Sequence, residues 1–533
     1  MIETDVLIVG AGPAGLATAI SLKRCGFAGR VVVIDKGCAV GSHVLSGAVM
    51  DPAGFRELLT EEEIAKLPVE AHVNRESFRF IFGAKASMPI PWVPPMMQAH
   101  GFPVGSLTKV ARYLASIAER LGAEVYTGYA VTELIERDGV VVGARTGEKG
   151  LAADGRPKSN HLASEEIAAK VTVLAEGGAG VLTDRLVEAK GLAGRRPQSY
   201  AIAVKELIEL AEPVAGSGGT IMHTFGYPVN LWTYGGGFVY HVSDSRVMVG
   251  YALGLDYIDA TLDVHEIFRR YKATGAVGRH ISGGKAVAYG AKVIPEGGFY
   301  AMPRPHALGA LIVGDGAGLL DGLRIKGIHI AIESGIAAAA AIAETSADAA
   351  AVGERYHALL RATRGYAEVR RVKNVHGGFT RGAPFGVAMA GLAWATFGRF
   401  PFWMFGRRHR DSETMRELRP GALEAAARCA ADPAIRAFPD RLTDVFMSGT
   451  LHEEDQPCHL HLVDPARCEA CERRFGSPCT RFCPAEVYRR DEGRLRIDFS
   501  NCLHCKTCRI KCPLENVEWR FPQGGDGPRY TMM

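Results

Sequence analysis

The sequence predicts an α/β protein with a nucleotide-binding sheet domain at its amino end and a small cysteine-rich domain at its carboxyl end. Two observations support this prediction. An apolar run, a glycine-rich turn and a second apolar segment occupy residues 5–20, and eight of the 12 Cys residues lie between Cys468 and Cys512. The 533 residues of the chain are enough for about two to four domains with a large buried core.

Composition excludes several classes of protein. Hydrophobic residues make up 47% of the chain and charged residues 23%, which argues against a disordered or collagen-like protein. The net charge of +4 gives no electrostatic reason to expect nucleic-acid binding. A strand-like run, Asp5–Val9, begins almost at Met1, so we expect no export signal and a reducing compartment. Clustered cysteines in such a compartment indicate metal binding rather than disulfides.

The first motif is a predicted strand, turn and helix over residues 6–20. Its turn reads Gly10-Ala11-Gly12-Pro13-Ala14-Gly15. In this pattern the first Gly makes the tight turn, the second lets the backbone approach a pyrophosphate, and the third lets the helix pack closely on the strand. The helix N-terminus then faces the phosphates. This motif predicts a bound dinucleotide.

A second predicted strand supplies the acidic partner of that motif. Residues 31–34 are Val-Val-Val-Ile, and Asp35 follows them 20 residues beyond Gly15. An acid at this spacing can hydrogen-bond a ribose hydroxyl. The agreement of strand, glycines, helix and acid argues against a glycine turn without a ligand.

A later segment indicates which dinucleotide is bound. Residues 310–318 form another strand that ends in Gly314-Asp315, and residues 171–177 end in Glu176-Gly177. This pattern resembles FAD-containing proteins with two dinucleotide-binding folds, in which the late Asp binds the ribityl chain of the flavin. The alternative for Asp315 is a cap on the following helix. The sequence has no second complete G-x-G-x-x-G motif, so we expect no separate NAD(P)H domain and another route for electrons.

The cysteine-rich end contains the run C-x2-C-x2-C-x3-C-P, formed by Cys502, Cys505, Cys508 and Cys512. Three thiolates at this spacing wrap one 4Fe–4S cube, and the fourth Cys binds a different cluster when two clusters are present. Structural zinc is the alternative, although it prefers two separated C-x2-C pairs. The run therefore predicts an iron–sulfur centre.

A stretched copy of this run lies upstream, where the spacing is C-x2-C-x7-C-x3-C-P. Crossed ligation, as in two-cluster ferredoxins, divides the eight cysteines into two groups of four. The longer middle spacing leaves open whether the second group holds a cube, holds zinc or is empty. The first set is Cys483, Cys502, Cys505 and Cys508, and the second set is Cys468, Cys471, Cys479 and Cys512.

Along essentially its whole length the chain resembles the electron transfer flavoprotein–ubiquinone oxidoreductase family. In that family FAD sits between one 4Fe–4S cluster and a ubiquinone pocket, on a monotopic membrane protein. The common form of the family lacks the second set of cysteines, which puts the single-cluster count in doubt here. The matching segments include residues 10–15, 45–48, 233–236, 284–291, 325–327, 448–450, 482–485, 501–508 and 527–528.

The resemblance implies roles for individual residues. The first set would bind the cluster, and Tyr488 and Thr507 would place hydroxyl donors near it and tune its potential. Tyr234, Gly235 and Gly236 would line the quinone pocket, although Tyr-Gly-Gly between strands is also typical of a hairpin turn. No catalytic acid or base is assigned. The FAD-binding candidates are Gly10, Gly12, Pro13, Ala14, Gly15, Asp35, Lys36, Leu45, Ser46, Gly47, Glu176, Gly177, Gly314, Asp315 and Gly327.

Two apolar segments are candidates for contact with a membrane surface. No stretch offers about 20 consecutive apolar residues, so a spanning helix is not expected. Residues 88–97 are apolar and contain four Pro residues, and residues 382–410 contain Trp394 and Phe402–Phe405 before the basic Arg407–Arg410. Aromatic residues followed by cations suit an element anchored on anionic lipid. The second segment could instead be a buried helix and loop.

These observations lead to one functional expectation. The chain is expected to transfer electrons from electron transfer flavoprotein, through a 4Fe–4S cluster and FAD, to ubiquinone or another membrane quinone. We expect it on the cytoplasmic face of a bacterial inner membrane, with no nucleic-acid partner. One alternative is a flavin-dependent reductase of isoprenoid double bonds, as in geranylgeranyl reductases, and another is a ferredoxin-like docking subunit with a structural flavin.

The expected architecture is a FAD-binding two-dinucleotide-binding (Rossmann-like) domain with an inserted antiparallel α+β quinone-binding domain and a carboxy-terminal ferredoxin-like iron–sulfur domain. The FAD-binding domain is expected at residues 1–80, 105–185 and 296–376. The other parts are membrane-associated segments at 81–104 and 377–411, the quinone-binding domain at 186–295 and the iron–sulfur domain at 412–533.

Overall fold

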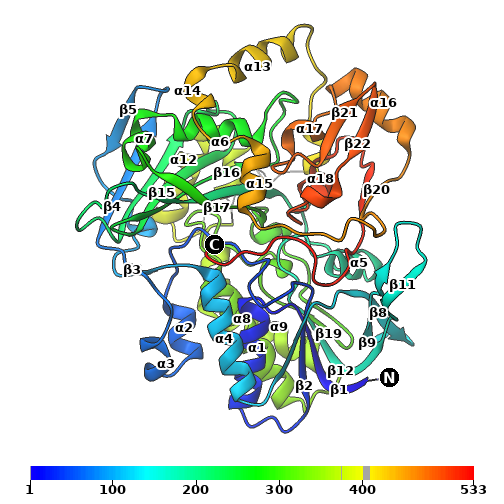
Figure 1. Cartoon of the computed structure of the whole chain (residues 1–533). Coiled ribbons are helices and arrows are strands. Elements are labelled where there is room, and N and C mark those ends of the chain that lie inside the picture. The colour runs from blue at the N-terminus through cyan, green and yellow to red at the C-terminus, as the bar shows by residue number, and fades with distance from the viewer. Residues whose placement is uncertain (1, 374, 400–408) are drawn as a thin grey trace.

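The computed structural model describes residues 2–373, 375–399 and 409–533. Two large sheets dominate the fold, and the carboxy-terminal helices and hairpins cover one end of the second sheet (Figure 1). The predicted α/β class, with an inserted antiparallel domain and a small carboxy-terminal domain, is confirmed. The predicted Phe402–Phe405 and Arg407–Arg408 portion of the second apolar segment lies outside the described residues.

The first sheet has eight strands in the order β18–β19–β12–β1–β2–β7, with the β8–β9 hairpin joined to β12 through β9. Strands β1, β2, β7, β12 and β19 run parallel. The central strands read as continuous apolar runs because both of their faces are buried. The strands are β1 (Ile2–Val9), β2 (Val31–Asp35), β7 (Glu124–Thr127), β8 (Val131–Arg137), β9 (Val140–Thr146), β12 (Glu166–Leu174), β18 (His306–Ala307) and β19 (Ala310–Ile312).

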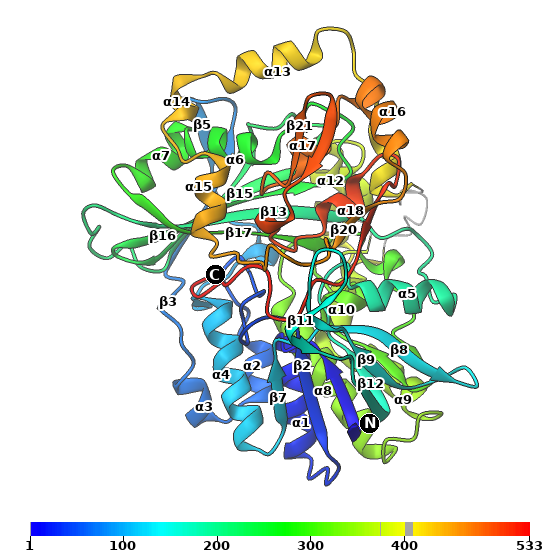
Figure 2. The same cartoon turned by 45° about the vertical axis from the view of Figure 1, so that its right-hand side comes forward.

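Small residues allow the helices of this domain to approach each other closely. A Cβ atom added at Gly335 would lie 2.3 Å from the carbonyl oxygen of Ala14, so a larger side chain would separate the two helices that carry these residues. Figure 2 shows the helices beside the parallel strands in the lower half of the molecule. The helices are α1 (Pro13–Arg24), α4 (Leu107–Arg120), α8 (Ile328–Glu344), α9 (Val352–Ala362) and α10 (Arg364–Arg371).

The second sheet has seven strands in the order β17–β13–β16–β15–β14–β4–β5. All neighbouring pairs are antiparallel except β14 and β4. Because β4 pairs with β14, the chain enters this sheet at residue 75, before the boundary expected at residue 80. The strands are β4 (Arg75–Ile81), β5 (Ser87–Ile90), β13 (Tyr200–Glu209), β14 (Thr220–Gly226), β15 (Gly235–Ser243), β16 (Arg246–Gly254) and β17 (Lys285–Pro295).

The cysteine-rich end packs on the second sheet and shares its hydrophobic core. Buried residues of β13, β16 and β17 belong to the same apolar cluster as Phe482 and Trp519. The last residues return to the first domain, where the Met533 carbonyl accepts hydrogen bonds from Ser106 Oγ and Thr108 N at 2.9 and 3.0 Å. The elements are α15 (Arg441–Met447), β20 (Leu460–Leu462), α16 (Pro465–Phe475), α17 (Cys479–Phe482), β21 (Tyr488–Asp491), β22 (Arg494–Ile497), α18 (Thr507–Lys511) and β23 (Val517–Trp519).

The two apolar segments differ in structure. The first contains β5 and a short 3-10 helix, Pro95–Met97, whereas the second contains helix α12 (Ala383–Ala395). Helix α12 buries Gly386, Met389 and Ala390 on one side and exposes Val387 on the other. Among the helices that the structure describes, none is both long enough and apolar enough to cross a membrane.

Candidate functional site

The glycine turn after β1 has the geometry of a nucleotide-binding loop. Gly10 has φ +114°, and an added Cβ would lie 2.3 Å from the Ala175 carbonyl oxygen, so only Gly fits there. An added Cβ at Gly15 would lie 2.1 Å from the Gly10 carbonyl oxygen. By contrast, an added Cβ at Gly12 would meet no protein atom within 4 Å. The loop is therefore packed at both ends and open at Gly12, where a pyrophosphate is expected.

Asp35 braces this turn from the end of β2. Its carboxylate accepts hydrogen bonds from the backbone N–H of Ala11 at 2.8 Å and of Gly37 at 2.7 Å. A carboxylate has about four lone-pair sites, so each oxygen retains capacity for a ribose hydroxyl. Glu176 also supports the backbone, because it accepts hydrogen bonds from both the N–H and the hydroxyl of Thr183, at 2.7 and 2.8 Å.

The side chain of Asp315 caps neither the 3-10 helix Gly314–Ala317 nor α8. Desolvation raises the pKa of Asp315 to about 6, and the neighbouring Lys292 opposes that rise. The next long helix, α8, begins after Gly327 and receives no side-chain cap. The structure thus disfavours the helix-cap alternative and leaves the carboxyl group of Asp315 directed to the cavity described next.

A single cavity of about 1180 Å³ connects these elements. Every FAD-binding candidate lines it except Gly15, which packs behind the loop. Tyr234, Gly235 and Gly236 line the same cavity, as do both apolar segments. The fold therefore brings the predicted nucleotide residues, quinone residues and apolar segments to one space, although they are spread over more than 300 residues of the chain.

The Tyr-Gly-Gly segment is not a hairpin turn. Gly235 and Gly236 open strand β15 and pair with Leu253 and Ala252 of β16. The hydroxyl of Tyr234 donates to the Gly322 carbonyl at 3.4 Å. The Tyr234 ring packs on Phe379, with the ring centroids 5.1 Å apart. The segment therefore joins the second sheet to the loop that precedes α8.

Exposed aromatic and apolar side chains surround one side of this cavity. Trp92 and Trp394 line it although 62% and 46% of their surfaces are exposed. Trp232 is 75% exposed and packs beside Gly382. Exposure of large apolar side chains to water is unfavourable. Contiguous patches of them therefore mark interaction surfaces. The apolar lip is defined here as Phe82, Met88, Trp92, Trp232, Val387 and Trp394.

The first set of cysteines lines a second, small cavity together with Tyr488 and Thr507. All four cysteines of this set are buried. The Thr507 hydroxyl lies 3.4 Å from Cys505 Sγ, and the backbone N–H of His504 donates to Cys502 Sγ at 3.4 Å. Burial and the neighbouring Cys505 raise the pKa of Cys483 to about 11. Four buried thiols around one cavity are a donor set for a soft metal centre.

The two cavities share a wall. Lys506, adjacent to Cys505, lines both of them. Its ammonium donates to the Ala179 carbonyl at 2.8 Å and lies 5.3 Å from the centroid of the Trp519 ring. Trp519 also lines the large cavity. A group bound by the first set would therefore be next to a group bound in the large cavity.

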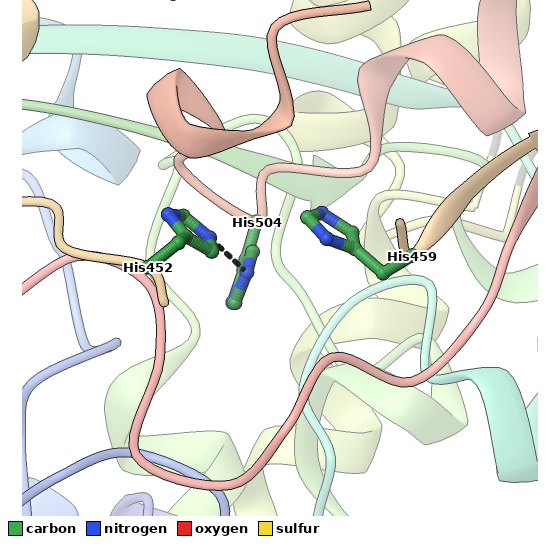
Figure 3. A group of neighbouring side chains, drawn as sticks. All are labelled: His452, His459 and His504. Carbon is green, nitrogen blue, oxygen red and sulfur yellow. Dashed lines mark hydrogen bonds between the residues drawn. The ribbon is translucent and has the colours of Figure 1, made fainter. Parts of the chain in front are cut away.

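Three buried histidines, His452, His459 and His504, meet beside this wall (Figure 3). The Nε2 atoms of His452 and His504 are 3.0 Å apart, and His452 Nδ1 donates to the Ser500 carbonyl at 2.9 Å. Burial lowers the pKa of all three imidazoles. Sequence reasoning missed this group, because His452 and His459 are far from His504 in the chain.

The comparisons with known proteins agree with this geometry. The family model for the electron transfer flavoprotein-ubiquinone oxidoreductase 4Fe-4S domain matches residues 436–531, and the ETF-QO ubiquinone-binding model matches residues 200–294. A pyridine nucleotide-disulphide oxidoreductase model matches residues 4–192. The electron transfer flavoprotein-ubiquinone oxidoreductase of Pseudomonas aeruginosa is 36% identical over 100% of this chain and 99% of that protein. The chain belongs to the electron transfer flavoprotein–ubiquinone oxidoreductase family.

Members of the family from distant organisms are equally similar. The mitochondrial protein of Oryza sativa subsp. japonica is 35% identical over 99% of this chain and 93% of that protein. The mitochondrial protein of Homo sapiens is 36% identical over 100% of this chain and 89% of that protein. A geranylgeranyl bacteriochlorophyll reductase-like protein from Thermoplasma acidophilum has a TM-score of 0.56 at 18% identity, covering 82% of this chain and 98% of that one, which shows the fold alone.

The family implies FAD and a 4Fe–4S cluster, and the residues present fit both groups. The space beside Gly12 is open to a pyrophosphate, and an added Cβ would occupy part of it. The first set of cysteines supplies four thiols around one cavity, as a cluster requires. Two members of the second set, Cys468 and Cys512, both accept hydrogen bonds from Asn516.

One acidic residue of the large cavity was not predicted. Glu296 follows β17 and lines the cavity, and its Oε2 atom is buried with no hydrogen-bond partner among the described residues. Burial raises the pKa of Glu296 well above its usual range, and Asp321 and Asp256 raise it further. The sequence around Glu296 carries no motif, so only the structure identifies this buried carboxyl group within an oxidoreductase site.

Proposed function

We propose that this member of the family oxidises reduced electron transfer flavoprotein and reduces ubiquinone, or another membrane quinone, through a 4Fe–4S cluster and FAD. One observation supports the proposal above all. The cavity lined by the FAD candidates is also lined by Tyr234, Gly235 and Gly236 and by every member of the apolar lip except Trp232, and it shares Lys506 with the first set of cysteines. Such an arrangement gives a continuous route from a cluster to a lipid-soluble acceptor.

When bound, the cluster and FAD supply the one-electron and two-electron chemistry, and the protein supplies binding, orientation and electrostatics. Gly12 and the N-terminus of α1 would hold the pyrophosphate, Asp35 the ribose and Asp315 the ribityl chain. Cys483, Cys502, Cys505 and Cys508 would hold the cluster. Thr507 and Tyr488 would donate hydrogen bonds that stabilise its reduced form.

The apolar lip would hold the protein on the membrane surface. A quinone is insoluble in water, so it must reach the cavity from within the bilayer. Exposed Trp side chains at the lip suit the headgroup region of a membrane, where one edge of the ring is apolar and the other wet. We place the protein as a monotopic enzyme on the cytoplasmic face of a bacterial inner membrane, with electron transfer flavoprotein as its soluble partner.

The two alternatives are less well supported. A reductase of isoprenoid double bonds shares the fold, but it has no use for a cysteine-rich domain whose cavity adjoins the flavin cavity. A docking subunit with a structural flavin would not need an apolar cavity of about 1180 Å³ beside the flavin loop.

Turnover of the purified protein tests the function. Anaerobically purified protein, mixed with reduced electron transfer flavoprotein and a short-chain ubiquinone, is expected to form ubiquinol at a rate that depends on both substrates. Protein that contains FAD and cluster but forms no ubiquinol in this assay would overturn the proposal.

A further inference from the structure

The second set of cysteines forms a group apart from the small cavity that the first set lines. Cys468 and Cys471 lie three residues apart on helix α16 and therefore point to the same side of it. Cys479 is the first residue of α17, and Cys512 directly follows α18. The fold thus brings together residues from three separate helices, which are spread over 45 positions of the chain.

One residue joins two members of this set. Asn516 donates from its side-chain nitrogen to Cys468 Sγ at 3.2 Å and from its backbone N–H to Cys512 Sγ at 3.3 Å. The same amide is held in place by Asp464, which accepts from Asn516 Nδ2 at 2.7 Å and donates from its backbone N–H to Asn516 Oδ1 at 2.9 Å. N–H donors directed at cysteine sulfurs are typical of iron–sulfur sites, where they stabilise thiolate ligands.

The remaining two members lie within electrostatic reach of this pair. The pKa of Cys479 is raised well above its usual range by burial, and then by Cys471, Cys512 and Cys468 in that order. Burial, Cys512 and Cys468 likewise raise the pKa of Cys471 to about 12. Helix α17, which begins at Cys479, packs against α18, which Cys512 follows. The four thiols therefore lie around one place.

The distances between these sulfurs favour a cube over a zinc ion. Zinc binds thiolates at about 2.3 Å in a tetrahedron, which places any two sulfurs about 3.8 Å apart. Within the described residues, no three cysteine sulfurs all lie within 4.8 Å of one another. This holds for the second set as it does for the first set. A cube spreads its four thiolates more widely, because each one binds a different iron.

We infer that Cys468, Cys471, Cys479 and Cys512 bind a second 4Fe–4S cluster. The presence of this cluster is inferred from the cysteines themselves. Its role in electron transfer rests on the proposed function. The structure supports crossed ligation, since Cys512 of the downstream run shares Asn516 with Cys468 of the upstream run, whereas Cys483 of the upstream run lines the first cavity.

The position of the second set suits the entry of electrons. Cys468 and Cys479 are only part-buried, whereas all members of the first set are buried. The two sets meet at α17, where the backbone N–H of Cys483 donates to the Cys479 carbonyl at 3.3 Å. An electron leaving the reduced flavin of the donor protein would reduce the second cluster and pass to the first one. Two such electrons, together with two protons, would convert one quinone to one quinol.

Metal content decides the inference. Full-length protein purified without oxygen is expected to contain about eight irons and eight acid-labile sulfides per FAD, and no stoichiometric zinc. The double substitution Cys471→Ser and Cys479→Ser is expected to reduce both values to about four per FAD, with one reducible cluster left in the electron paramagnetic resonance spectrum. The matched control is Cys458→Ser, since Cys458 is part-buried but belongs to neither set. The control should keep the wild-type iron content.

The opposite outcomes are equally clear. Wild-type protein with about four irons per FAD, or with four irons and one zinc, would overturn the second cluster even if ubiquinol is formed. Ubiquinol formation with four irons would leave the proposed function standing. Eight irons per FAD without any quinone reduction would support the second cluster and overturn the proposed function. Should the double variant fail to fold, the wild-type iron, sulfide and zinc contents still decide.

Discussion

The ammonium of Lys36 lies 3.3 Å from Nδ1 of His504, although 468 residues separate them in the chain. Lys36 follows strand β2, whose end carries Asp35, and His504 lies between Cys502 and Cys505. The same ammonium is 4.9 Å from the centroid of the Trp519 ring. This contact joins the loop expected at the flavin to the loop expected at the first cluster, and thereby fixes their relative positions.

Replacement of Lys36 tests this contact. Burial and the neighbouring Lys506 and Lys292 lower the pKa of the Lys36 amine well below its usual range. Lys36→Met removes this amine and whatever positive charge it carries beside the first cluster, and positive charge stabilises the more negative reduced state. We expect the midpoint potential of that cluster to fall by an amount on the order of tens of millivolts, with the iron content unchanged. Potentiometric titration measures the shift. Lys85→Met, at an exposed lysine outside both cavities, should leave the potential where it is.

The glycine turn provides a pair of substitutions that separate binding from folding. Gly12→Ala places a methyl group where no protein atom lies within 4 Å, so the apoprotein should keep its melting temperature while FAD binding weakens at least tenfold, about 1.4 kcal/mol. Gly10→Ala drives a methyl group into the Ala175 carbonyl and should lower both stability and flavin content. Equal melting losses in the two variants would contradict the assigned roles.

The Thr507 hydroxyl, 3.4 Å from Cys505 Sγ, offers a conservative probe of the first cluster. Thr507→Ala removes the donor and should lower the midpoint potential, again by an amount on the order of tens of millivolts, because hydrogen bonds to the sulfurs stabilise the reduced cluster. Thr507→Ser keeps the hydroxyl and should restore most of that shift. If Thr507→Ala and Thr507→Ser have the same potential, the hydroxyl has no such role.

The features that the sequence predicts well are local ones. The turn at Gly10, the acid at Asp35 and the cysteine run each lie within a few dozen residues, and their spacing carries the geometry. Lys36 and His504, by contrast, meet only because the carboxy-terminal domain packs back on the first one. No periodicity or motif encodes such a meeting.

The same reasoning explains the residues that sequence analysis missed or misplaced. Strand β4 joins the second sheet through a parallel pair with β14, which begins 145 residues later (Arg75 to Thr220). The three histidines of Figure 3 come from two distant segments. Glu296 is one acid among 58 acidic residues, and only its burial without a partner distinguishes it.

Trp92 and Trp232 of the apolar lip test membrane association. Replacing both with Ser removes two exposed aromatic rings, each of which can contribute about 1–2 kcal/mol of burial in the interface. Co-sedimentation with liposomes should therefore fall by at least tenfold, whereas reduction of a short-chain soluble quinone should be retained. Phe446→Ser, at a side chain that is 85% exposed but lies outside the apolar lip, is the matched control. Unchanged liposome binding by the Trp variant would argue against the lip.

Glu296 predicts the pH dependence of turnover. Burial, Asp321 and Asp256 raise its pKa well above the usual range, and the buried Tyr234 is a further titratable neighbour. Glu296 therefore holds its proton to a higher pH than an exposed Glu does, and it can give that proton within the cavity where quinone is reduced. As pH rises through the raised pKa, that proton is lost and turnover should fall.

Glu296→Gln should remove this alkaline decline and lower turnover by roughly tenfold or more, since positioned acids contribute about 10²–10⁴-fold. The pH dependence of the free energy of unfolding gives a second measurement. Because native Glu296 keeps its proton at pH values where the unfolded side chain has lost it, the free energy of unfolding falls as pH rises between the two pKa values. Glu296→Gln should flatten that slope, which urea titrations between pH 5 and 9 would measure. A variant that keeps both the alkaline decline in turnover and the slope would show that another group carries the proton.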